Sequence, residues 1–158
     1  AQTLTQQNAD LLSAFGIQYG ASHSEYIRDT NGNFNFLETS SRVGGANLAE
    51  MVEAASGINL WAEWAKIEIA AKLDVPYKLP ETEKQHAGIV ISLSRYEWPD
   101  LGPFFDEEIC WKMIKKHHIG FIVRSKVQQR VVQLLETYTS RIQSEYHASL
   151  PAPDRPTN

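Results

Sequence analysis

The sequence is poor in cysteine and in positive charge. Cys110 is the only cysteine among 158 residues, which excludes an internal disulfide framework and favours a reducing compartment such as the cytoplasm. Lys and Arg number 15 against 19 Asp and Glu, so the net charge is −4. This balance provides no general attraction for phosphate backbones or anionic lipids, and neither nucleic acid nor a membrane is an expected partner.

Long apolar runs are also missing. Residues 88–93 (GIVISL) are far too few to span a bilayer. The first ten residues, AQTLTQQNAD, have neither the basic nor the apolar region of a secretory signal. A hydrophobic fraction of 42% nevertheless suits the core of a globular protein with the length of about one domain.

Hydrophobic periodicity and turn residues predict the elements of the first half. They are a helix, two strands of a hairpin and two further helices, at residues 9–15, 17–28, 33–39, 47–57 and 59–73. Asn31-Gly32 is the expected two-residue hairpin turn. Asn47 is the expected N-cap of its helix, with Glu50 as capping-box partner, and Gly57 is the expected stop.

A connection rich in proline and charge, residues 76–84, is the predicted internal boundary. Beyond it we expect a strand, a short helix, a strand and a long helix, at residues 87–94, 106–115, 119–124 and 126–146. The expected buried face of the long helix consists of Val127, Val131, Leu134, Tyr138 and Ile142. The fold class is α+β, with an antiparallel sheet and flanking helices in residues 1–80, a small α/β subdomain in 81–150 and an extended or disordered tail in 151–158.

The hairpin places two acids opposite each other. Counting back along both strands from Asn31-Gly32 pairs Glu25 with Glu38. Directly opposed like charges cost a few tenths to ~1 kcal/mol, and two carboxylates at this separation share a proton or bind a cation. Mg²⁺ is usually held by one or two carboxylates together with substrate phosphates. The pair therefore predicts a divalent-metal site.

More polar side chains share this face. With a period of two, Ser40 and Arg42 follow Glu38, and the same count places His23 opposite Ser40. The planar guanidinium of Arg42 suits a phosphoryl or acyl-phosphate oxygen that gains negative charge. These residues predict a phosphate site beside the metal.

A glycine pair follows the polar cluster. Gly44 and Gly45 would let the backbone approach a ligand just before a helix N-terminus, where N–H groups favour anions. The alternative is that the two glutamates are solvated edge charges, that Arg42 is their salt-bridge partner and that the glycines only form a turn. Residue spacing alone leaves both interpretations open.

Residues 24–60, SEYIRDTNGNFNFLETSSRVGGANLAEMVEAASGINL, resemble the metal-binding hairpin and following helix of the ATP-grasp superfamily. The resemblance is to the branch of biotin carboxylase, carbamoyl-phosphate synthase and the L-amino-acid ligases. Its pattern is an acid on one strand, Phe-(Ile/Leu)-Glu-x-Asn-x-Arg on the next, and a helix that ends in Thr/Ser-Gly-hydrophobic-Asp/Asn-Leu, here residues 56–60 (SGINL). The resemblance implies that Glu25 and Glu38 are metal ligands and that Arg42 is the active-site arginine.

The resemblance also has two departures. Ser40 stands where the family usually has Asn, and its hydroxyl is a shorter and weaker ligand for metal or phosphate. The family's phosphate-binding lysine, glycine-rich flap and adenine-contacting hinge lie in an earlier domain, and none of them precedes Gly16 in this sequence. We therefore expect a C-terminal portion of an ATP-grasp ligase that needs a missing N-terminal segment or subunit.

The resemblance implies ATP and Mg²⁺, or Mn²⁺ in its place, as cofactors. The parent enzyme would join a small-molecule carboxylate to an amine, or to a related nucleophile, through an acyl phosphate. Two alternatives remain open: a non-catalytic subunit, and a degenerate ATP-grasp module with a structural or oligomerising role. A homo-oligomer is a further expectation, because an absent N-terminal partner would leave apolar surface exposed.

Two other features have structural interpretations. Cys110 is expected to be a buried thiol on the short helix at 106–115, not a nucleophile. His117 and His118 have no third ligand at metal-binding spacing, so a structural or lid role is expected for them.

Overall fold

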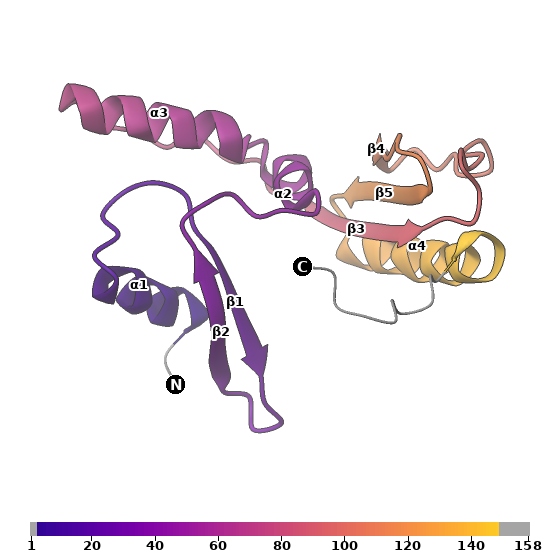
Figure 1. Ribbon diagram of the computed structural model, residues 1–158, viewed down its shortest axis with the longest axis horizontal. Helices are drawn as coiled ribbons and strands as arrows, with labels where there is room; N and C mark the ends of the chain where they lie inside the picture. The colour runs from indigo at the N-terminus through magenta and orange to yellow at the C-terminus, as the bar shows by residue number, and fades with distance from the viewer. Residues whose placement is uncertain (1–2, 149–158) are drawn as a thin grey trace, which may run out of the picture. The chain divides into compact units, whose positions relative to one another are not determined.

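A computed structural model describes residues 3–148, and the predicted tail at 151–158 lies outside this range (Figure 1). The chain divides into two compact units. The first contains residues up to Ala49 together with Ile58–Thr82, and the second contains Glu50–Gly57 together with the residues from Glu83 onward. The boundary predicted near residue 80 stays a prediction. Among the described residues, no helix is long and apolar enough to cross a membrane.

The first unit contains a helix, a hairpin and a second long helix. Their bounds are α1 Leu4–Ala14, β1 His23–Arg28, β2 Phe34–Ser40 and α3 Leu60–Leu73. Helix α1 begins earlier than expected because the Thr3 hydroxyl caps it, accepting from Gln6 N at 3.2 Å. Strand β1 begins later than residue 17, and Gly20 explains part of the delay, since its φ of 114° interrupts extended backbone.

The hairpin turn differs from the expected two-residue form. The backbone N–H of Asp29 donates to Asn33 O at 2.9 Å, so three residues lie between these partners. Only Gly32 has a positive φ, 89°, whereas a type I′ turn needs two such residues. The Asp29 carboxylate accepts from the side chain and backbone of Asn33 and from Asn31 N. These hydrogen bonds, that of the Asn33 side chain first, lower the pKa of Asp29.

Helix α2 (Leu48–Ser56) ends at Gly57 as predicted, with φ 73° at that glycine. Its start differs from the prediction. Asn47 has a φ of 62°, which is left-handed, whereas an N-cap residue has extended backbone. The next helix, α3, is capped by Asn59, whose Oδ1 accepts from Ala62 N at 2.9 Å.

The second unit is a three-stranded antiparallel sheet in the order β3-β5-β4 with a helix packed against it (Figure 1). The strands are β3 His86–Leu93, β4 Ile109–Lys112 and β5 His118–Ser125. The helix is α4 Gln128–Arg141, which continues as the π-helical turn η1 Ile142–Tyr146.

The helix predicted at residues 106–115 is wrong, since β4 occupies this segment. Burial alternates along it: Ile109 and Trp111 are partly buried, whereas Cys110 and Lys112 are exposed. This is the period of two of a strand that pairs with β5. The expectation of a buried Cys110 thiol is wrong for the same reason.

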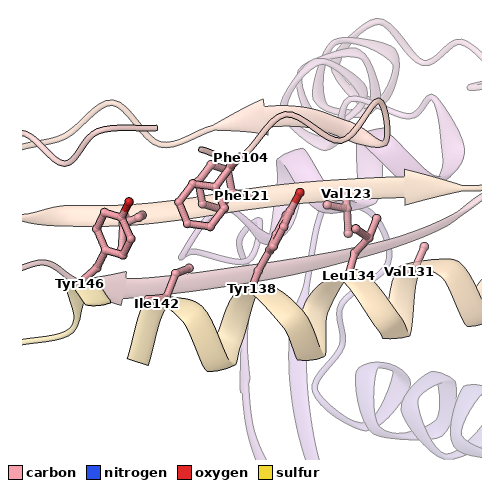
Figure 2. Close-up of a cluster of buried hydrophobic side chains, with 9 residues drawn as sticks. Phe104, Phe121, Val123, Val131, Leu134, Tyr138, Ile142 and Tyr146 are labelled. Atoms are coloured by element: carbon pink, nitrogen blue, oxygen red, sulfur yellow. The ribbon is translucent and has the colours of Figure 1, made fainter. Parts of the chain in front are cut away.

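The core of the second unit lies between the sheet and α4 (Figure 2). Its buried side chains are Phe104, Ile119, Phe121, Val123, Val131, Leu134, Tyr138, Ile142 and Tyr146. Four of the five residues expected on the buried helix face are present. The fifth, Val127, is exposed because it precedes the first residue of α4.

An ion-pair network ties the loop before β4 to α4. Arg130 contacts Glu108 through Nε at 2.7 Å and Nη2 at 3.1 Å, and Nη2 also donates to Asp106 Oδ1 at 2.8 Å. Tyr138 donates its hydroxyl proton to the other oxygen of Asp106 at 2.5 Å. The hydrogen bonds from Arg130 are the largest cause of the lowered pKa of Glu108.

We expect the second unit to lose stability in acid through Glu108. Its folded-state pKa lies below the ordinary value of 4.5, so its contribution is complete above pH 4.5 and is lost as the pH falls through the lower folded value. Urea titrations of the chain at several pH values, followed by the amide signals of β5, measure this loss. The substitution Arg130→Gln should reduce the loss of unfolding free energy at acidic pH. An unchanged dependence of stability on pH would show that the Arg130–Glu108 pair does not cause the loss.

Candidate functional site

The hairpin brings the predicted acids together. Glu25 pairs with Glu38, and His23 pairs with Ser40, in the predicted register. Two deviations cancel to give this result. The turn shifts the pairing by one residue, so that Arg28 lies opposite Phe34, and a bulge between Glu25 and Tyr26 restores the expected count.

The opposite face of the hairpin fixes this register. The hydroxyls of Ser24 and Thr39 form a hydrogen bond of 2.9 Å across the strands. Beyond the bulge, the rings of Tyr26 and Phe36 meet edge to face with centroids 5.8 Å apart. Cross-strand pairs of these kinds stabilise one register over its neighbours, so the acidic pair is held in place from the other side.

The protein places little positive charge near Glu25 and Glu38. Both carboxylates are exposed, and the nearest partner of Glu25 is His23, whose Nδ1 lies 3.9 Å from Oε1. This distance is too long for a hydrogen bond. Over residues 3–148, no ion pair or side-chain hydrogen bond involves Glu38. Within residues 3–148, no lysine or arginine forms an ion pair with either glutamate, and a bound cation would supply the missing positive charge.

Arg42 lies beyond the end of β2 and turns back on its own chain. Its Nη1 donates to Val43 O at 3.0 Å, and its backbone N–H donates to Ser40 O at 3.0 Å. In the described part of the chain, no ion pair links Arg42 to Glu25 or Glu38. The alternative in which Arg42 is their salt-bridge partner is not realised in this structure.

The two glycines have different surroundings. A Cβ on Gly44 would lie 3.1 Å from Cδ2 of His23, so the backbone passes closely over this imidazole. A Cβ on Gly45 would meet only Arg42 Nη1, at an ordinary 3.8 Å. The left-handed residues of this segment are Ala46 and Asn47, with φ of 52° and 62°. Such backbone costs of order 1–3 kcal/mol per residue and is common at ligand sites, and no pattern of residue types signals it here.

The candidate site thus consists of His23, Glu25, Glu38 and Ser40 on the hairpin, with Gly44 against His23. Among residues 3–148, no group of three or more His, Cys, Asp or Glu side chains is arranged to hold a metal. A divalent cation at Glu25 and Glu38 would need further ligands from water or from phosphate oxygens, which is the usual coordination of Mg²⁺.

The described fold is similar to part of two solved structures. It is similar to L-amino acid ligase from Bacillus licheniformis, with a TM-score of 0.62, 16% identity, and coverage of 93% of this chain and 42% of that one. It is also similar to phosphoribosylglycinamide synthetase from Anaerococcus prevotii, with a TM-score of 0.55, 17% identity, and coverage of 86% and 39%. The fold expected from the resemblance is confirmed, and the chain spans less than half of either structure.

The sequence matches no protein-family model and no curated protein.

Proposed function

We propose that this chain contributes the metal- and phosphate-binding half of the active site of an ATP-grasp carboxylate–amine ligase. The observation that carries the proposal is the opposed pair of Glu25 and Glu38, exposed and with no cation of the described chain at hydrogen-bond distance. The fold shared with ATP-grasp proteins supports it. A hairpin of this fold that specifies two facing carboxylates is suited to a divalent cation.

Each residue of the site would have a separate role in binding or catalysis. Glu25 and Glu38 would hold Mg²⁺ or Mn²⁺, and the Ser40 hydroxyl would support them. The ion would neutralise ATP phosphate oxygens while a carboxylate takes the terminal phosphoryl group, which gives an acyl phosphate and ADP. Arg42 would leave Val43 O to meet the phosphoryl or acyl-phosphate oxygens. An amine would then displace phosphate from the acyl group.

His23 and the glycines would shape the cofactor side of this site. Close packing of Gly44 on His23 fixes the imidazole next to Glu25. Gly45 leaves room for phosphate, because an added Cβ there would have no neighbour closer than 3.8 Å. Left-handed backbone at Ala46 and Asn47 follows directly after these glycines.

The remaining active-site elements would come from an N-terminal segment or a separate subunit. Apolar side chains of the hairpin support this, since Ile27, Phe36 and Leu37 are 57%, 45% and 55% exposed. A second copy of this chain is the competing partner for the same surface. The substrates would be a small-molecule carboxylate and an amine, and the single cysteine fits the cytoplasm.

Mn²⁺ titration of the isotopically labelled chain tests the metal assignment. The paramagnetic ion should broaden the amide signals around Glu25 and Glu38 before those of other acids. The substitution Glu38→Gln removes a direct ligand with little change in shape, and we expect it to weaken binding at least about tenfold, as disturbed metal ligation usually does.

Glu107→Gln is the matched control, because it removes the same charge from an exposed position in the second unit. Equal Mn²⁺ affinity in the wild-type chain and Glu38→Gln would eliminate the proposed site.

A further inference from the structure

The second unit contains a cavity of about 520 Å³ at the end of β3 and the start of β5. The residues that line it include Leu93, Arg95, Lys116, His117, His118 and Ala148. Its size is within the range of small-molecule sites. None of its residues belongs to the hairpin, so a ligand here would be distinct from a cation at Glu25 and Glu38.

The lining is basic in an acidic protein. The chain has a net charge of −4, yet none of the lining residues within 3–148 is an acid, and two of them, Arg95 and Lys116, are basic. Glu97 is the partner of Lys116, at 2.6 Å, and both side chains of this pair are exposed. An exposed pair of this kind is worth ~1 kcal/mol or less. An anion in the cavity can therefore compete with Glu97.

Arg95 is held in a defined orientation. Its Nε and Nη2 donate to His147 O at 3.2 and 3.0 Å, and its backbone N–H donates to Tyr146 O at 2.9 Å. Over residues 3–148, Nη1 has no hydrogen-bond partner. The guanidinium thus has a fixed plane and a donor left over for a ligand, which reduces the entropy lost on binding.

His117 is held in an uncommon backbone conformation at the cavity. Its φ is 56°, in the left-handed region. Hydrogen bonds on both sides keep it there, since its N–H donates to Glu97 O at 2.9 Å and its carbonyl accepts from Ser94 N at 2.8 Å. Strained residues that the surrounding structure fixes in this way gather at ligand sites.

A hydrogen bond determines the tautomer of the neighbouring His118. Its Nδ1 lies 2.8 Å from Lys116 O, and a carbonyl can only accept, so Nδ1 carries the proton. In the neutral ring, Nε2 is then an acceptor that suits a hydroxyl or a protonated group. Beside these polar groups, Leu93, 42% exposed, and Ala148 supply apolar wall.

We propose that this cavity binds a small organic anion, with a carboxylate or phosphate head on Arg95 and Lys116 and a short apolar body against Leu93 and Ala148. Charge-assisted hydrogen bonds from a fixed guanidinium orient the head. Burial of the body adds affinity in proportion to the apolar area removed from water.

NMR titration of the full chain with phenyl phosphate is the test, with benzoate and inorganic phosphate as parallel probes. Saturable shifts should concentrate on the amides of Arg95, His117 and His118. Whichever of phenyl phosphate and benzoate binds with the higher affinity shows whether the cavity prefers a phosphate or a carboxylate head group. Inorganic phosphate, which has no apolar body, should bind more weakly than phenyl phosphate.

Lys116→Gln should weaken phenyl phosphate binding about tenfold, since hydrogen bonds to charged groups are the stronger class. Lys115→Gln, with the same charge change one residue away and outside the lining, should have no effect. Leu93→Ala should weaken phenyl phosphate but not inorganic phosphate. Shifts spread over lysines of both units, or equal losses in Lys115→Gln and Lys116→Gln, would overturn the proposal.

Discussion

Phe104→Ala is expected to destabilise the second unit by about 3–5 kcal/mol, the usual cost of deleting a buried phenyl ring. The side chain of Phe104 is 0% exposed although it lies in an irregular segment. Its ring centroid is 4.4 Å from that of Phe121 and 5.2 Å from that of Tyr138, so it joins the sheet to α4 (Figure 2). Arg141 stacks over it at 5.0 Å. Alanine would leave a cavity among aromatic rings that cannot close over it.

Phe105→Ala is the matched control, because its side chain is 83% exposed and its loss should change stability by no more than about 0.5 kcal/mol. Urea unfolding followed by the amide signals of β5 reports the second unit alone. If both variants lose similar stability, Phe104 is not the centre of this core.

The fold was predictable where local chemistry and burial agree. The Gly57 stop of α2 and four of the five residues expected on the buried face of α4 follow from residue type and spacing, and the structure confirms them. Phe104 shows the opposite case. No periodicity marks a residue in a loop, and only the aromatic rings of β5 and α4 make its position a core position.

The helix prediction at residues 106–115 failed because EEICWKMIKK can satisfy two periods. The apolar residues Ile109, Trp111 and Met113 alternate with other residues, which fits a strand. The apolar spacing in a segment this short fits a helix equally well. Pairing with β5 decides between them, and a local pattern contains no information on that pairing. Tertiary pairing thus overrode a local pattern.

The candidate site was predictable on the hairpin and not beyond it. Glu25, Glu38, His23 and Ser40 occupy a regular ladder, and their register needed only a count from the turn. That count gave the right partners because a three-residue turn and a bulge offset each other. The direction of Arg42 depends on irregular backbone after β2, where hydrogen bonds and left-handed residues replace periodicity.

Gly120→Ala is expected to destabilise the second unit by about 2–3 kcal/mol, towards the upper end of the cost of overpacking. Gly120 is buried in the central strand β5 opposite Ile91. A Cβ there would lie 2.9 Å from Val90 O and 3.0 Å from Ile91 Cγ1. The first of these is a backbone atom, so relief requires β3 to move away from β5.

Gly88→Ala separates this backbone clash from simple crowding. Its Cβ would come even closer to a neighbour, 2.4 Å from Leu135 Cδ1, but that atom ends a side chain that can change rotamer. We expect a loss of about 1 kcal/mol for Gly88→Ala, measured by the same urea titrations. A larger loss for Gly88→Ala than for Gly120→Ala would show that α4 packing, not strand separation, limits this sheet. Because β5 begins at His118, movement of β3 away from β5 in Gly120→Ala should also weaken anion binding at the cavity beside Arg95.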